Sequence, residues 1–192
     1  MGKPGKSSRP SALLSARWQD IDLTARLWHI PAADMKTKTP LYRPTVGLGG
    51  RKILRELHTQ TGDNIHLFPG IRPRRKPAPP HPDHISIKFA HNAIRRLGYD
   101  GSTPGKSKHT MHGFRHLFTN ISLTAGKDTL TTDLALGHIS RAALQRAGFS
   151  SLHHYLTADS YRLQERRELA EWYSRRHRQA YEAAAQNTCN KT

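Results

Sequence analysis

The stretch Met111–Thr124 reads MHGFRHLFTNISLT and has the pattern of an amphipathic helix. Its apolar side chains recur three or four positions apart, as one face of an α-helix requires: Phe114, Leu117, Phe118 and Ile121. His112 and Arg115 are also three positions apart, so a single helix can present both side chains to one target. The stretch therefore predicts a packed helix that carries a polar pair at its start.

This polar pair has the chemistry to act on a phosphate. An imidazole exchanges a proton near neutral pH, and a guanidinium binds phosphate through two parallel hydrogen bonds. The pair alone is weak support, because the chain has 13 His and 31 Lys plus Arg among 192 residues. Leu136-Gly137-His138 and Tyr155 follow it, however, and a tyrosine hydroxyl can act as a nucleophile. Together these groups predict phosphodiester chemistry.

The composition points to a polyanionic partner. A formal net charge of +17 favours DNA, RNA or an acidic membrane surface. A chain of 192 residues corresponds to one ordinary domain. No apolar run approaches the roughly 18 residues of a membrane span. The single cysteine, Cys189, excludes a disulfide within the chain and fits a reducing cytoplasm.

The rest of the chain predicts a mainly helical protein with one small antiparallel sheet, of the α+β class. Residues 27–31 and 43–48 form the expected strands of a hairpin with Lys36 near its tip, and Asp20-Ile21-Asp22 is interpreted as a turn. A Pro/Arg-rich segment at 69–82 and a Gly/Ser/Pro segment at 98–107 are expected to be irregular. Apolar periodicity predicts helices at 11–18, 50–62, 85–97, 111–124, 130–136 and 159–184.

Six short motifs occur in a fixed order along the chain. They are Arg9-Pro10-Ser11-Ala12, Trp18-Gln19-Asp20-Ile21-Asp22, the segment Ile30-Pro31-Ala32-Ala33-Asp34-Met35-Lys36, His112-Gly113-Phe114-Arg115, Leu136-Gly137-His138, and Tyr155. In this order they resemble the catalytic domain of the tyrosine recombinases, also called phage integrases. Two stretches are most similar to integrases of satellite prophages: the sequence around Lys36 and the run YRLQERRELAEW at 161–172.

The resemblance implies a role for each of six residues. Arg9 and Arg115 would clamp the non-bridging phosphoryl oxygens and stabilise their growing charge. Tyr155 would attack phosphorus to form a 3′-phosphotyrosyl link, with His112 taking the phenolic proton. Lys36 would protonate the departing 5′-oxygen, and His138 would hydrogen-bond a phosphate oxygen. Tyr161 is the alternative nucleophile, because it also follows His138.

The same resemblance implies the partners. We expect the chain to bind a double-stranded DNA attachment site and to have no membrane partner. We expect a homotetramer on DNA, and a monomer is compatible with the resemblance in the absence of DNA. Religation through a covalent intermediate needs no cofactor, and His153-His154 lacks the carboxylate or cysteine partners of a metal site. The expected localisation is cytoplasmic, at the bacterial nucleoid.

Two departures from the family pattern bear on activity. Ala12 stands where the family has an acidic residue that would orient Arg9. Only eight residues precede Arg9, so we expect an N-terminally truncated catalytic domain. In that interpretation 1–8 is a flexible leader, 9–184 is the catalytic domain fragment, and 185–192 is a disordered tail.

Three other functions remain open from the sequence. An inactive DNA-binding remnant of a prophage integrase would keep the basic charge but lose the arginine clamp. A type IB topoisomerase-like enzyme would share the phosphotyrosyl chemistry, although the sequence around Lys36 argues against it. An RNA-binding module is the weakest, because no recognised RNA-binding motif is present. Taken singly, Arg9 and Lys36 are more typical of solvated surface cations than of functional residues.

Overall fold

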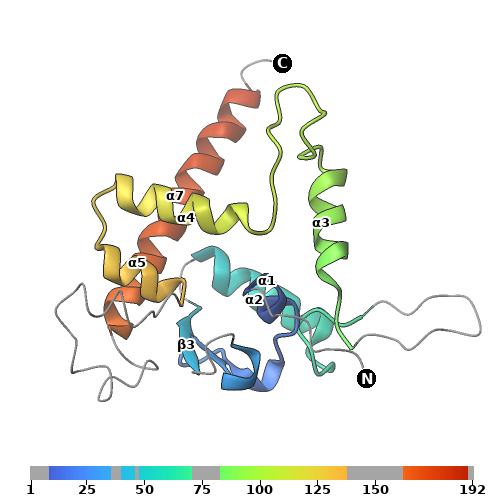
Figure 1. Ribbon diagram of the computed structural model, residues 1–192, viewed down its shortest axis with the longest axis vertical. Coiled ribbons are helices and arrows are strands. Elements are labelled where there is room, and N and C mark those ends of the chain that lie inside the picture. Colours follow the sequence, from blue (N-terminus) through green and yellow to red (C-terminus); the bar gives the residue numbers. More distant parts are fainter. Residues whose placement is uncertain (1–8, 36–39, 46–47, 71–82, 138–161, 190–192) are drawn as a thin grey trace, which may run out of the picture.

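A computed structural model describes residues 9–35, 40–45, 48–70, 83–137 and 162–189. Within these ranges the chain is mainly helical with one three-stranded antiparallel sheet, which confirms the predicted fold class at that level (Figure 1). The helices are α1 (Arg9–Leu14), α2 (Leu48–Thr61), α3 (Ile87–Arg96), α4 (Gly113–Thr124), α5 (Thr129–Ala135) and α7 (Leu163–Cys189). The strands are β1 (Ile21–Asp22), β2 (Leu27–Ile30) and β3 (Leu41–Pro44), with short 3-10 helices η1 (Trp18–Asp20) and η2 (Ala32–Asp34).

The sheet has the order β1-β2-β3, with Ile21 opposite Trp28 and Trp28 opposite Arg43. Two predictions for this region were wrong: the turn at residues 20–22 and the second strand of the hairpin. Ile21–Asp22 forms a strand that pairs with β2. The turn follows this strand, since the carboxylate of Asp22 accepts the backbone N–H groups of residues 24 and 25. The strand β3 occupies Leu41–Pro44 and not residues 43–48, since Leu41 is buried opposite Ile30.

The first helix also differs from the prediction of 11–18. It begins at Arg9 and ends at Leu14, and Trp18 opens a separate 3-10 turn. The reason is a backbone bridge: Leu67 N donates to Ala16 O at 3.0 Å, and Trp18 N donates to Ile65 O at 3.0 Å. These bonds satisfy the backbone groups that a longer helix would have used internally.

The main hydrophobic core lies between the sheet, the end of α1 and α2. Its buried members flank or belong to the sheet, and Trp28 and Ile30 alternate with half-buried neighbours along β2, as a strand with one covered face requires. The indole of Trp18 donates to Thr61 O at 2.9 Å and so fixes the end of α2 against this core. The buried core residues are Ala16, Trp28, Ile30, Met35, Leu41 and Leu67.

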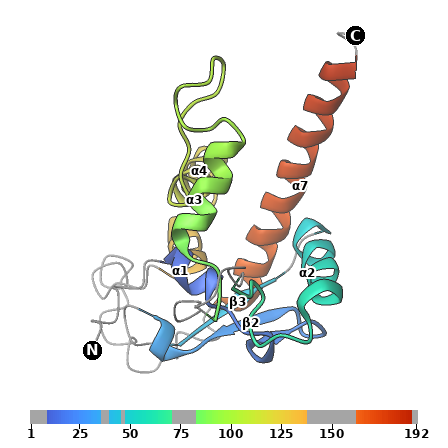
Figure 2. The same ribbon diagram turned by 90° about the vertical axis from the view of Figure 1, so that its right-hand side faces the viewer.

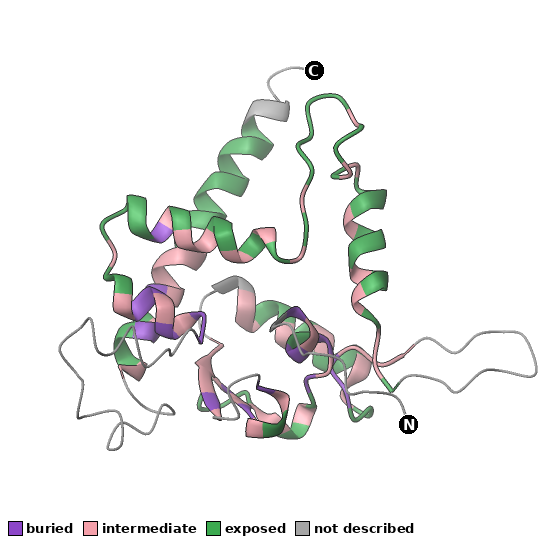
Figure 3. Cartoon of the chain, in the orientation of Figure 1, coloured by how far each residue is buried: buried purple, intermediate pink, exposed green. Residues whose placement is uncertain are grey.

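Helix α7 crosses from α5 to the sheet, and α3 and α7 rise as two arms from the base that holds the sheet (Figures 1 and 2). Arg166 is the buried contact: it is 1% exposed and donates to Tyr42 O of β3 at 2.8 Å. Arg167 donates to Ala25 O at 3.1 Å. The far part of α7 and most of α3 are exposed (Figure 3). The run of charge that opens α7 therefore includes a structural arginine.

None of the helices that the structure describes combines the length and the apolar composition needed to cross a bilayer.

Candidate active site

The polar pair lies where α4 begins. His112 is the N-cap residue, its carbonyl accepts the backbone N–H of Arg115 at 3.0 Å, and its side chain is exposed. Its ring meets the ring of His116 edge-on, with 4.8 Å between centroids. His116 was missed in the sequence, although its spacing of four from His112 places both imidazoles on one side of a helix. The start of α4 therefore presents two neighbouring imidazole side chains.

A close contact disfavours a side chain at Gly113, the second position of the motif. A Cβ atom at Gly113 would lie 3.0 Å from Cε1 of His109. The His109 ring is held there by an edge contact with Phe114, with 4.3 Å between centroids. The N–H of Gly113 is satisfied by Thr110 Oγ1 at 3.1 Å. The residues before the helix thus fix the backbone from which His112 and Arg115 project.

Arg115 joins α4 to the end of α5. Its Nη2 atom donates to the carbonyl of Leu136 at 3.1 Å. Burial lowers the pKa of Arg115, yet a guanidinium remains charged at any physiological pH. The hydrogen bond holds this cation in a half-buried position beside the Leu-Gly-His turn. The structure therefore brings together the described parts of two motifs that the sequence separates by 21 positions.

The Leu-Gly part of that turn ends α5. Leu136 is buried at 7% exposure, and Gly137 has φ +65°, a left-handed conformation that glycine adopts without steric cost. Gly137 N donates to Leu134 O at 2.8 Å, which closes the last helical turn. This cap fixes the backbone conformation at the end of the described segment.

The other predicted site residues are placed only in part. Arg9 begins α1, but its side chain is outside the described part of the structure. Lys36, His138, Tyr155 and Tyr161 lie outside the described residues altogether. Their convergence on Arg115 therefore remains a prediction. Among the described residues, no three His, Cys, Asp or Glu side chains gather where they could hold a metal ion.

Ala12 sits at a buried position of α1. Its exposed fraction is 6%, and its neighbours Pro10 and Leu14 are buried as well. A carboxylate at this position would be removed from water, which is costly unless a cation pairs with it. Ala12 packs there without that cost, and it supplies no group to orient Arg9.

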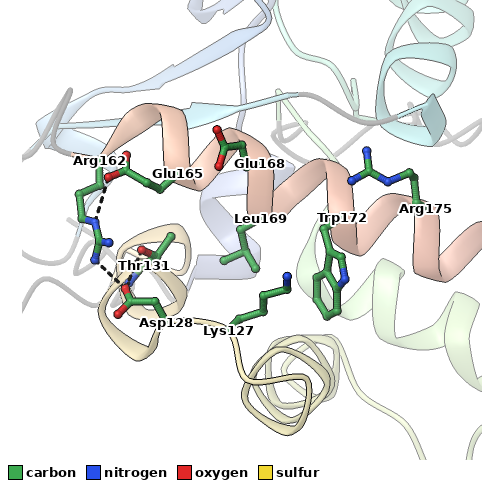
Figure 4. Close-up of a pocket in the computed structure, with 9 residues that line it drawn as sticks. All are labelled: Lys127, Asp128, Thr131, Arg162, Glu165, Glu168, Leu169, Trp172 and Arg175. Atoms are coloured by element: carbon green, nitrogen blue, oxygen red, sulfur yellow. Dashed lines mark hydrogen bonds and ion pairs between the residues drawn. The ribbon is translucent and has the colours of Figure 1, made fainter.

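A polar junction links the start of α5 to the start of α7. The Oδ2 atom of Asp128 accepts hydrogen bonds from Thr131 N and Thr131 Oγ1, both at 2.7 Å, and from Arg162 Nη1 at 2.6 Å. Arg162 Nε also donates to Glu165 Oε1 at 3.2 Å. These groups line a cavity of about 440 Å³ together with Lys127 and Trp172 (Figure 4).

The charges of Asp128 and Arg162 are matched within this junction. Partial burial acts to raise the pKa of Asp128, but the hydrogen bonds from Thr131 and the charge of Arg162 outweigh it and lower the pKa overall. Burial acts to lower the pKa of Arg162, while Glu165 and Asp128 raise it overall. Lys127, a further cation of the cavity, lies over the ring of Trp172 at 4.6 Å. The junction is therefore a structural clamp between two helices.

Two curated proteins resemble the chain. It is 27% identical over 167 residues to the "Prophage integrase IntA" of Escherichia coli (strain K12), covering 87% of this chain and 35% of that protein. It is 29% identical over 186 residues to the "Integrase" of Enterobacteria phage P4, covering 86% of this chain and 36% of that protein. The chain thus spans about a third of the length of each relative.

No protein-family model matches the chain, and no solved structure matches it. Both curated relatives carry the name integrase, and these two similarities support an integrase relationship for this chain.

Proposed function

We propose that this chain is the strand-cleaving part of a site-specific DNA recombinase of the tyrosine class, which integrates and excises mobile DNA. The observation that carries the proposal is the hydrogen bond from Arg115 to Leu136 O, which joins the H-x-x-R helix to the L-G-H turn. The similarity to two integrases and the net charge of +17 support it. An RNA-binding module would not require these two motifs to be adjacent.

Arg115 would stabilise the charge that develops on the scissile phosphate. A guanidinium carries five N–H donors, so a bond to a backbone carbonyl orients the group and is compatible with bidentate phosphate binding. The half-buried position of Arg115 strengthens its attraction to a phosphate, because charge interactions strengthen as water is excluded. In the proposed site Arg9 is the second half of the clamp.

The proposed reaction exchanges one phosphodiester for another. The Tyr155 oxygen bonds to phosphorus as the bond from phosphorus to the 5′-oxygen breaks, which leaves a 3′-phosphotyrosyl link. His112 accepts the phenolic proton, Lys36 gives a proton to the 5′-oxygen, and His138 hydrogen-bonds a phosphoryl oxygen. Attack by a 5′-hydroxyl of another strand reverses these steps, so the bond energy is kept without a nucleotide cofactor.

A covalent-capture experiment on DNA of randomised sequence tests the proposal. The protein is incubated with nicked duplexes that contain a randomised segment, and protein–DNA adducts are recovered under denaturing conditions and sequenced. We expect a defined sequence to be enriched, and adducts on that sequence to disappear in Tyr155→Phe. Tyr161→Phe is the matched control and should retain them. Absence of any adduct, or an adduct that survives both substitutions, would overturn the proposal.

A second candidate is a DNA-binding remnant without cleavage activity. The burial of Ala12 favours it, because the described part of α1 offers no carboxylate at the position expected to orient Arg9. This candidate predicts salt-dependent DNA binding with no adduct from any member of the same pool. The capture experiment therefore separates the two candidates directly.

A further inference from the structure

A basic cleft lies between α3 and the segment that leads into α4. We call it the α3 cleft. Its volume is about 490 Å³, and its lining includes Lys88, His91, Arg95, Tyr99, Lys108 and His109. Figures 1 and 2 show the setting: α3 stands as a separate arm, and the following segment arches over and returns to the start of α4. The cleft is separate from the α5–α7 junction and shares no lining residue with it.

The helical wall of the cleft is a polar stripe. Lys88, His91 and Arg95 are spaced by three and four positions, so they occupy one face of α3. All three side chains are exposed. In the ranges that the structure describes, neither Lys88 nor Arg95 takes part in an ion pair. The apolar residues of α3 lie at other positions, so this face of the helix is polar.

One carboxylate, Asp100, lines the cleft beside three permanent cations. It is bonded to Ser102, whose N–H donates at 2.9 Å and whose hydroxyl donates at 2.8 Å. These hydrogen bonds lower the pKa of Asp100. Asp100 therefore shapes the loop at Ser102 and offsets one of the three positive charges of the cleft, which keeps a positive excess.

His109 adds a buried polar atom that lacks a partner. Its Nε2 atom is shielded from solvent and has no hydrogen bond within the described residues. The ring cannot turn freely, because Phe114 meets it edge-on at 4.3 Å and the backbone of Gly113 lies against it. A buried polar group without a hydrogen bond is unfavourable, and a bound acceptor removes that penalty. The cationic wall suits a phosphate, and the ring of His109 lies beside it in the lining of the cleft.

We infer that the α3 cleft binds a non-scissile phosphate of the DNA backbone and so positions the duplex for the α4 site. This inference rests on the proposed function for its choice of DNA as the source of the phosphate. The connection to the site is short: His109 and Thr110 line the cleft, and Thr110 Oγ1 accepts the N–H of Gly113 at the start of α4. A phosphate held in the cleft would fix the duplex beside His109 and Thr110, which closely precede His112 in the chain.

Two double variants with equal charge loss provide the main test. Lys88→Gln/Arg95→Gln removes one Lys and one Arg from the cleft face of α3, and Lys52→Gln/Arg55→Gln removes the same pair from exposed positions of α2. Binding of a fluorescent duplex is measured by anisotropy over a series of salt concentrations. The slope of log K against log[salt] should fall by about 0.9 in the α3 variant, the value for one lost phosphate contact. The α2 variant should keep the wild-type slope.

The role of His109 is tested by His109→Phe, which keeps a ring against Phe114 but removes the nitrogen. We expect this variant to unfold at the wild-type temperature and to bind duplex several-fold more weakly. An NMR titration with inorganic phosphate then separates the two sources of the ligand. Shifts of the His109 ring with duplex but not with millimolar phosphate indicate backbone recognition, whereas equal shifts with both indicate a general anion site and overturn the DNA assignment.

Failure of this inference is distinguishable from failure of the proposed function. Equal salt slopes for the α2 and α3 variants, with adducts still formed, would overturn the cleft and leave the recombinase proposal standing. A slope change confined to the α3 variant, with no adduct on any duplex, would leave the cleft and overturn the recombinase proposal.

Discussion

At the α5–α7 junction the carboxylate of Asp128 accepts three hydrogen bonds, one of them from Arg162. In the α3 cleft, Lys88 and Arg95 take part in no ion pair among the residues the structure describes, and the Nε2 atom of His109 is without a partner. Both regions are rich in charge, but only the first pairs its central charges internally. The difference separates charge that holds helices together from charge that is available to a ligand.

Arg115 combines both kinds of charge, the structural and the ligand-binding. Its substitution is expected to have the largest effect on activity. Its bond to Leu136 O is structural, while its proposed partner is the scissile phosphate. We expect Arg115→Ala to reduce the rate of adduct formation by about 10³-fold, the scale seen when a donor to developing charge is removed. Single-turnover cleavage of the captured sequence measures this rate.

Arg115→Lys sharpens the same point. Lysine keeps the charge but has no planar fork to bond a carbonyl and a phosphate together. We therefore expect it to recover little of the lost rate while duplex affinity stays near that of the wild type. Near-complete recovery by lysine would mean that the bond to Leu136 has no positioning role.

Asp128→Ala tests the internally paired region. The substitution removes the N-cap of α5 and one partner of Arg162, and we expect a loss of about 1–2 kcal/mol in the free energy of unfolding. Asp128→Asn keeps a capping oxygen and should cost less. Urea denaturation followed by circular dichroism measures both. Duplex affinity should not change, in contrast to the α3 variants.

The same carboxylate makes stability depend on pH. Burial acts to raise the pKa of Asp128 in the folded state, but the hydrogen bonds from Thr131 and the charge of Arg162 lower it overall. The contribution is therefore fully present above the unfolded pKa of about 3.9, and it is lost as the pH falls through the folded pKa. Between about pH 5 and pH 3, the range around the unfolded pKa of aspartate, the wild type should lose free energy of unfolding faster than Asp128→Asn. Parallel curves would contradict the assignment.

Gly113→Ala probes the segment that connects the α3 cleft to α4. The new Cβ atom would stand 3.0 Å from Cε1 of His109, so the ring must move away from Phe114. We expect a loss of about 1 kcal/mol, of the size typical for a strained contact. The double variant with His109→Ala should regain most of what Gly113→Ala loses, and a double-mutant cycle of unfolding free energies measures that coupling. Additive losses would show that the two residues do not interact.

Much of this arrangement could be predicted from the sequence, because amphipathic periodicity locates α2, α3, α4, α5 and α7 to within a few residues. The two-residue strand β1 could not, since two residues show no periodicity and only pairing with β2 defines them. The burial of Arg166 was equally hidden, because its acceptor, Tyr42 O, lies 124 positions away. Motif order predicted that Arg115 and the Leu-Gly-His turn act together. The orphan nitrogen of His109 has no sequence signal, since it arises from the packing of Phe114 and Gly113.

Asp100→Asn has the smallest expected effect and compares the two regions most directly. Like Asp128, Asp100 is a carboxylate with a lowered pKa that caps a nearby backbone N–H, but it is the carboxylate of the α3 cleft. Asparagine keeps an oxygen for the Ser102 N–H, so thermal unfolding should be unchanged. Removing the negative charge should increase duplex affinity a few-fold at low salt, and the gain should shrink as salt screens the cleft. If stability falls as in Asp128→Asn and affinity does not rise, the cleft carboxylate has the same structural role as Asp128, and the distinction between the two regions is lost.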